Sequence, residues 1–381
     1  MKIIIGGDLV PTKTNKKRFI SGDIDKLLDK KLQAKWFSAD LRIFNLETPL
    51  VSYRSPIIKN GPNLIGSPET INGISKLDPS LISLANNHIM DQGLKGFKST
   101  LKLLKENKIS YVGAGMNIKG AKQPYIIEKK NKKIGIYSCA EHEFTIAEEN
   151  KAGANPFDPL ESLDHIKDLK NKCDYVIVIY HGGKEHYRYP SPNLQKTCRK
   201  MTEKGADLVL CQHSHCIGSY EEYNNSTILY GQGNFIFIMK NNEFWNTGFL
   251  VEVNIEKKFK INYIPFEVDN FGISFLEGQE KDQLLEEFEQ RSKKVVDSQF
   301  VKEKYKEFAR TNFQSYLRNL SPFGKWFSRI DRIIFKGALI NKVYNQKKLL
   351  KILNIIKCEA HHELLIEGIE EEINTSKGEL I

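Results

Sequence analysis

Apolar and polar residues follow one another in the first part of the chain in blocks that are typical of an α/β protein. Six short apolar runs each have the length of one buried strand, and stretches with apolar residues at helical spacing lie between several of them. The predicted strands cover residues 3–6, 41–45, 81–85, 134–139, 175–180 and 208–211, and the predicted helices include residues 94–104 and 160–169.

The pattern changes after Tyr220 and again near Glu280. Three further strands are predicted from β-branched or alternating residues, at 227–230, 249–255 and 259–266. Beyond about Glu280 the apolar residues are spaced as in helices only. This order predicts a layered α/β sandwich at residues 1–275, followed by a C-terminal helical appendage at 276–381.

Polar side chains follow the predicted strands at the edge where an open α/β sheet binds its ligands. In chain order, these positions hold Asp8, Asn45, Glu47, Asn86, Asn87, His88, Asp91, Glu141, His142, His181, Glu185, His213 and His215. Oxygen and imidazole donors in this mixture suit Mn, Fe or Zn, whereas an all-oxygen set would favour Mg or Ca. The sequence therefore predicts a hydrolytic centre with a divalent metal.

Each of these residues also has a simpler explanation when it is taken alone. An Asp after a strand, such as Asp8, commonly caps a helix or closes a turn, and Asn86 and Asn87 could cap the helix that follows. His213 and His215 are harder to explain in this way, because alternate residues of an extended strand point to the same side and can reach one ion. Six strand ends with ligand chemistry favour one shared site over six coincidences.

Charge and composition describe the setting of that site. The formal net charge is +10, and residues 300–357 alone hold 14 Lys or Arg against 3 Asp or Glu. No apolar run reaches the length of about eighteen residues that a membrane span needs, and the first apolar stretch is too short for a signal peptide. Six cysteines at irregular positions favour reduced thiols. We therefore expect a cytoplasmic protein.

Six segments of the chain carry recognisable motifs: GDLV at 7–10, NLETPL at 45–50, SLANNHIMDQGLKGFKSTLKLL at 83–104, HGGKEH at 181–186, GADLVLCQHSH at 205–215 and LYGQGNFIF at 229–237. They resemble, in order, the motifs of the CapA, or poly-γ-glutamate capsule-synthesis, family over about residues 1–268. That family belongs to the calcineurin-like metallophosphoesterase superfamily. The resemblance implies a four-layer α-β-β-α sandwich with one or two divalent ions at the strand ends.

The resemblance also implies a role for each polar residue. The implied metal ligands are Asp8, Glu47, Asn87, His181, His213 and His215, with Glu47 between the two ions. His88 would protonate the leaving oxygen, and Asp91 would orient His88. The implied reaction is in-line attack of metal-activated water on a phosphorus centre. The expected substrate-binding residues are Asn45, Asn86, Glu185 and Asn234.

The chain departs from the related phosphoesterases at four positions. Val10 stands where the superfamily usually has a metal-binding His, so one metal position lacks a ligand. Gly182 and His186 replace aromatic residues of the HxGxE motif, and Gln212 replaces the Gly before the HxH pair. Many family members carry an N-terminal membrane anchor, and from residues 1–12 we do not expect one here.

Three classes of function follow from these features. The first is a metal-dependent hydrolase of capsule or surface-polymer synthesis, acting on a phosphate ester or an anionic, phosphate-containing or polyglutamate precursor. The second is a non-catalytic accessory of a poly-γ-glutamate or polysaccharide assembly machine. The third is a polyanion-binding protein, suggested by the basic C-terminal region alone. We expect no nucleic-acid partner, since no nucleic-acid module accompanies this charge.

The basic region at 317–356 combines apolar residues at roughly helical spacing with cationic residues. The apolar set is Leu317, Leu320, Phe323, Trp326, Phe327, Ile330, Ile333 and Ile334, and the cationic set is Arg318, Lys325, Arg329, Arg332 and Lys336. Such a pattern usually belongs to a helix that packs on its own domain. The alternative is peripheral contact with an anionic membrane at its inner face. Pro322 and Gly324 predict a break before Trp326.

Overall fold

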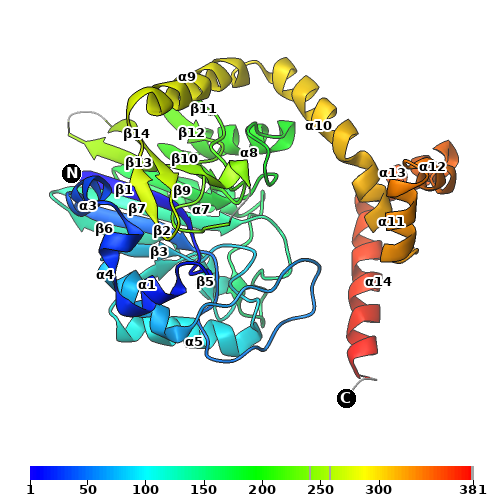
Figure 1. Cartoon of the computed structure of the whole chain (residues 1–381), viewed down its shortest axis with the longest axis horizontal. Helices are drawn as coiled ribbons and strands as arrows, with labels where there is room; N and C mark the ends of the chain where they lie inside the picture. The colour runs from blue at the N-terminus through cyan, green and yellow to red at the C-terminus, as the bar shows by residue number, and fades with distance from the viewer. Residues whose placement is uncertain (240–241, 257–258, 379–381) are drawn as a thin grey trace. The chain divides into compact units, whose positions relative to one another are not determined.

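The computed structural model describes residues 1–239, 242–256 and 259–378, and the chain divides into two compact units, Met1–Tyr305 and Lys306–Ile381 (Figure 1). The first unit contains the β-sheets, and the second contains only helices in its described part. Helix α9 (Gly278–Val295) lies after the expected boundary at residue 275 and belongs to the first unit. The extent of the family-type domain at 1–275 stays a prediction.

Two mixed β-sheets form the first unit (Figure 1). The first has the order β15 (Ile273–Phe275), β14 (Phe259–Val268), β13 (Thr247–Ile255), β1 (Lys2–Leu9), β2 (Leu41–Leu46), β3 (Leu81–Ser83) and β4 (Tyr111–Val112). The second has the order β11 (Tyr220–Tyr223), β12 (Ser226–Leu229), β10 (Leu208–Gln212), β9 (Tyr175–His181), β7 (Lys132–Ala140) and β6 (Tyr125–Lys129). Strands β1 to β4 run parallel, as do β7, β9, β10 and β12.

Three apolar cores separate four layers of structure. Ile3 and Ile5 of β1 point toward the second sheet, and Ile4 between them points toward the helices on the other side of its own sheet. Val176 and Val178 of β9 likewise face the helices that cover the second sheet. Both faces of the central strands are therefore buried, which explains their continuous apolar runs. The expected four-layer α-β-β-α sandwich is confirmed.

Helices cover the outer face of each sheet. The first sheet packs against α1 (Lys16–Ser21), α2 (Ile24–Leu27), α3 (Lys30–Phe37), α4 (Ile71–Lys76) and α5 (Gly93–Glu106), and the second packs against α7 (Ser162–Lys170) and α8 (Pro192–Glu203). Short elements complete the unit: α6 (Ile118–Ala121), η1 (Pro68–Thr70), η2 (Glu243–Trp245), β5 (Ala114–Gly115) and β8 (Gly153–Ala154).

Local sequence signals fix where several of these helices begin. The side chain of Ser191 accepts a hydrogen bond from the backbone N–H of Leu194, and Pro192 occupies the first turn of α8. Asp29 caps α3 in the same way through the N–H of Leu32. All nine predicted strands and both predicted helices are present, whereas the partly exposed strands β6 and β11 were not predicted.

The second unit continues from α10 (Ser298–Asn319) into α11 (Lys325–Ile333), α12 (Ala338–Val343), α13 (Gln346–Lys357) and α14 (Glu359–Gly378). The break between α10 and α11 contains Pro322 and Gly324, as predicted. The second unit has a small core of Leu317, Ile340 and Tyr344. Beside it, Arg318 Nε and Asp331 Oδ2 form a buried ion pair of 3.2 Å. In the described ranges, we find no helix with the length and apolarity needed to cross a membrane.

Trp36 tests the helix-to-sheet core. Its ring is fully buried, stacks on Phe235 at 5.0 Å between ring centroids, and donates from Nε1 to the carbonyl of Leu77 at 2.7 Å. Trp36→Ala should therefore lower the free energy of unfolding by about 3–5 kcal/mol in a urea titration. The neighbouring Phe37 is 41% exposed, so Phe37→Ala serves as the matched control. Equal effects of the two variants would contradict this packing.

Candidate metal centre

The polar strand ends of both sheets meet at one site. Asp8 lies near the end of β1, Glu47 directly follows β2, His181 ends β9, and His213 directly follows β10. Gly7 permits a close approach there, because a Cβ at this position would lie 2.1 Å from the carbonyl oxygen of Gly233. The segment after β12 can therefore pack directly on β1 and reach the site.

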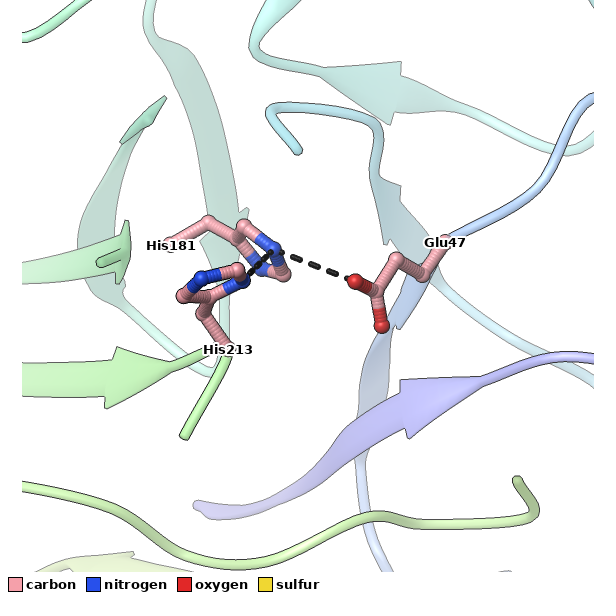
Figure 2. Close-up of side chains that lie close together, drawn as sticks. All are labelled: Glu47, His181 and His213. Carbon is pink, nitrogen blue, oxygen red and sulfur yellow. Dashed lines mark hydrogen bonds and ion pairs between the residues drawn. The ribbon is translucent and has the colours of Figure 1, made fainter. Parts of the chain in front are cut away.

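The first group of candidate ligands consists of Glu47, His181 and His213, whose side chains point toward one another in Figure 2. His181 Nε2 lies 3.3 Å from Glu47 Oε1 and 3.2 Å from His213 Nδ1. Asn87 Oδ1 lies 3.1 Å from the same His181 nitrogen. Four donor atoms from four strand ends thus converge on one position.

The second group consists of Asp8, Glu47 and His215, so Glu47 is shared between the two groups. His215 Nδ1 lies 3.6 Å from Asp8 Oδ2. The ring of His215 packs against Trp245, with 4.5 Å between ring centroids, and Val10 belongs to the same apolar cluster as Trp245. An apolar wall therefore borders this group at Val10, the residue where the sequence resemblance implied a missing ligand.

The backbone at the two histidines differs from the expected extended strand. Strand β10 ends at Gln212, and His213 and His215 have φ angles of 76° and 54°. Residues other than Gly rarely adopt this left-handed conformation, and such strain concentrates at functional sites. The prediction that the two histidines alternate on an extended strand is wrong, and each ring falls in a different group of candidate ligands.

Burial controls the charge of these ligands. Burial raises the pKa of Glu47 to about 8, with smaller contributions from Glu185 and other nearby carboxylates. Burial also lowers the pKa of His181 to about 4 and that of His213 well below its usual range. Neutral imidazoles are the form that binds metals. Among the described residues neither oxygen of Glu47 forms a hydrogen bond, although Oε1 lies 3.3 Å from His181 Nε2.

The donor set therefore fits a divalent cation. It joins neutral imidazole nitrogens, an amide oxygen and two buried carboxyl groups, which suits Mn, Fe or Zn. The buried carboxyl oxygens of Glu47 are unfavourable without a partner, and a cation between the two groups would provide one. Candidate metal-binding clusters are thus present, and the identity of the metal belongs to the proposal below.

His88 and Asp91 lie beside the first group. His88 Nδ1 is 2.6 Å from Asp91 Oδ2, and His88 Nε2 is 4.0 Å from Glu47 Oε1. The backbone N–H of His88 donates to Asn86 Oδ1 at 3.1 Å, which fixes the turn that carries the ring. This arrangement leaves the Nε2 side of His88 directed toward the candidate ligands. The expected orienting contact from Asp91 is present.

Three of the four expected substrate-binding residues use their side-chain amides to contact candidate ligands or one another. Asn45 is fully buried and donates to Asp8 Oδ1 at 2.7 Å, and Asn86 donates to Asn45 Oδ1 at 3.0 Å. Asn234 Oδ1 lies 2.8 Å from His215 Nδ1. Glu185 is exposed near the site. Their role in substrate binding stays a prediction. Asn45 and Asn234 contact candidate ligands directly, whereas Asn86 contacts Asn45.

Two residues near the site were missed by the sequence analysis. Lys59 has a side chain that is 3% exposed and forms an ion pair with Asp91. Glu143 Oε2 accepts a hydrogen bond of 3.2 Å from Asn87 Nδ2. Both residues belong to loops rather than to the ends of predicted strands, so no hydrophobic pattern marked them.

Comparison with known proteins identifies related chains. The family model described as "Bacterial capsule synthesis protein PGA_cap" matches residues 2–239. Capsule biosynthesis protein CapA of Bacillus anthracis is 32% identical over 181 residues, which make up 46% of this chain and 44% of that protein. PGA biosynthesis protein CapA of Bacillus subtilis (strain 168) is 31% identical over 173 residues, or 44% of this chain and 45% of that protein. The chain thus spans less than half the length of these curated relatives.

A solved structure described as a novel phosphatase of Mycoplasma pneumoniae has a TM-score of 0.41 and 16% sequence identity, and the alignment covers 72% of this chain and 90% of that one. A similarity this distant assigns no activity.

Removal of a candidate ligand tests the metal centre. His213→Ala and Glu47→Ala should each reduce the metal content of the purified protein, measured by inductively coupled plasma mass spectrometry, with an unchanged circular dichroism spectrum. The reason is that each variant removes a donor from a group of three or four. His142 also follows a strand but lies outside both groups, so His142→Ala is the matched control. Full metal content in both ligand variants would exclude this assignment.

Proposed function

The chain belongs to the bacterial capsule synthesis protein family, and on this premise we propose that it is a metal-dependent hydrolase of surface-polymer synthesis. The observation that carries the proposal is a buried carboxylate, Glu47, that lies among neutral imidazoles and beside the His88–Asp91 pair. Ligands alone would suit a binding site. A positioned imidazole next to them is what proton transfer requires.

Each residue of the site would contribute one part of the reaction. Glu47, Asn87, His181 and His213 would hold one ion, and Asp8, Glu47 and His215 would hold a second. A divalent ion held there supplies polarisation of a phosphoryl oxygen and activation of water. His88 would donate its proton to the leaving oxygen from Nε2, because Asp91 engages Nδ1 at 2.6 Å. We propose Mn, Fe or Zn as the metal.

The two metal positions would differ in strength. The first has four protein donors, whereas the second has three and is bordered by the apolar cluster of Val10, Phe237 and Trp245. Fewer donors and an apolar wall both weaken the binding of a cation. We therefore propose one firmly held ion and a second that exchanges more readily.

The substrate class follows from the chemistry and from the relatives. A centre of this kind suits a phosphate ester, and the related proteins carry names that refer to capsule and PGA biosynthesis. We propose a phosphate-containing or polyglutamate precursor of a surface polymer as the substrate. The second candidate is a non-catalytic accessory that binds such an anionic polymer, favoured by the incomplete second group of ligands.

His88 separates these two candidates. His88→Asn should leave the metal content unchanged and lower the rate of aryl phosphate hydrolysis by about 10²- to 10⁴-fold, the usual contribution of a general acid. The measurement is steady-state hydrolysis by protein of known metal content. A parallel loss of metal and rate would make His88 a ligand. No hydrolysis by the unmodified protein with any of the three metals would favour the accessory.

We also propose that helix α11 contacts an anionic membrane. Phe327 and Asp331 face the core of their own unit, whereas Trp326 and Ile333 are 76% and 61% exposed on a different face of the helix. Arg329, one turn from both, is exposed as well. An apolar stripe that its own unit leaves free, next to cationic residues, suits an interfacial helix.

Vesicle flotation tests this contact. The full chain should float with vesicles that contain phosphatidylglycerol at low salt, and Trp326→Glu with Ile333→Glu should abolish flotation, since both changes place charge in the acyl boundary. Leu160 of the first unit is 83% exposed, so Leu160→Glu is the control for an added surface charge. If the unmodified chain stays unbound, the proposed membrane contact is wrong.

A further inference from the structure

Lys59 reaches the His88–Asp91 pair from the loop at residues 51–66. Its ammonium group forms an ion pair with Asp91 Oδ1 and lies 3.3 Å from both the carbonyl oxygen of Asn87 and His88 Nδ1. The Lys59 side chain is 3% exposed and Asp91 is fully buried. Lysine is almost never this buried unless it is paired. The ion pair is therefore the reason for its position.

The loop is bound to the turn that contains Asp91. The N–H of Ile57 donates to the backbone carbonyl of Asp91 at 3.1 Å, and the N–H of Leu64 donates to Asp91 Oδ2 at 2.6 Å. Gln92 accepts from the N–H of Ser55 at 2.7 Å. These contacts lie on both sides of Lys59 in the sequence. They hold the loop so that Lys59 enters the site.

The loop buries its charged residue and exposes its apolar one. Ile58, next to Lys59, is 72% exposed. Simple packing of this loop would do the opposite, because apolar burial is favourable and burial of an ammonium group is costly. The loop thus leaves Ile58 exposed and places a buried cation beside Asp91.

The contacts of Asp91 explain what this cation does. Oδ2 accepts the N–H of Leu64 and faces His88 Nδ1, so Oδ1 is the oxygen that remains for Lys59. His88 Nδ1 can accept a hydrogen bond from this ammonium group or donate one to Asp91 Oδ2, but not both, and the shorter distance, 2.6 Å, favours the bond to Asp91. The ammonium group of Lys59 then contacts Asp91 Oδ1 and the carbonyl oxygen of Asn87, and a side chain that is 3% exposed offers almost no surface to a substrate. Lys59 therefore acts on the protein itself.

We propose that Lys59 is a positioning residue, which fixes the Asp91 carboxylate and through it the ring of His88. This inference rests on the proposed function only where it concerns the rate. With Lys59 in place, Asp91 Oδ1 faces the ammonium group, while Oδ2 accepts the N–H of Leu64 and faces Nδ1 of His88. Without it, the carboxylate can rotate or admit water, and the ring loses its fixed direction toward Glu47.

Steady-state kinetics separate positioning from substrate binding. Lys59→Met keeps most of the length of the side chain and removes its charge, and it should lower kcat by about 10- to 100-fold with little change in KM, as removal of a supporting contact usually does. Lys59→Arg should recover most of the rate. In an Asp91→Asn background, Lys59→Met should have almost no further effect, because the charge that Lys59 offsets is gone.

A rise in KM at unchanged kcat, or the same loss of rate in the Asp91→Asn background, would overturn the proposal in favour of a substrate contact. Lys102→Met, at an exposed lysine of α5, is the control. If Lys59→Met does not fold, as judged by circular dichroism, the same comparison is made with Lys59→Gln.

Proton NMR tests the same idea without any activity. A short hydrogen bond between His88 Nδ1 and Asp91 should give a downfield proton signal, identified by its loss in His88→Asn. The signal should broaden or disappear in Lys59→Met and remain in Lys59→Arg. An unchanged signal in Lys59→Met would contradict the positioning role. If the NMR result is as expected and the protein hydrolyses nothing, the hydrolase proposal fails and the role of Lys59 stands.

Discussion

The site depends on one unfavourable arrangement, a carboxylate buried where the described protein offers it no hydrogen bond. Glu47 is fully buried, and burial raises its pKa to about 8. A buried carboxyl group without a hydrogen bond is unfavourable, so a fold keeps one only where something else compensates for it. The nitrogen atoms of His181 and His213 are kept neutral by the same burial. A divalent cation would pair with the buried carboxyl group of Glu47 and would bind the neutral imidazoles.

The four-layer architecture makes this arrangement possible. Parallel strands of two sheets end at one place, so that ligands separated by up to about two hundred residues along the chain need no flexible segment to meet. The strain at His213 and His215 and the close approach at Gly7 are local costs of the same design. Asn45 and Asn86 link the ends of β1, β2 and β3 through hydrogen bonds.

Local patterns in the sequence predicted the strands and the polar residues that follow them, and the family resemblance implied the four-layer sandwich and the set of candidate ligands. Apolar runs marked β1, β2, β9 and β10, and the polar residues that follow them are brought together by the sheets. It did not reveal the left-handed backbone at His213 and His215, which depends on how the segment after β10 packs. Nor did it reveal Lys59, whose position is set by hydrogen bonds between a loop and the turn at Asp91.

Anomalous X-ray diffraction from a crystal of the full chain grown with Mn²⁺ tests the central claim most directly. The account predicts the strongest anomalous peak among Glu47, Asn87, His181 and His213, and a weaker one beside Asp8 and His215. The account would be contradicted if the side chains lay in the positions described here and neither place showed anomalous density.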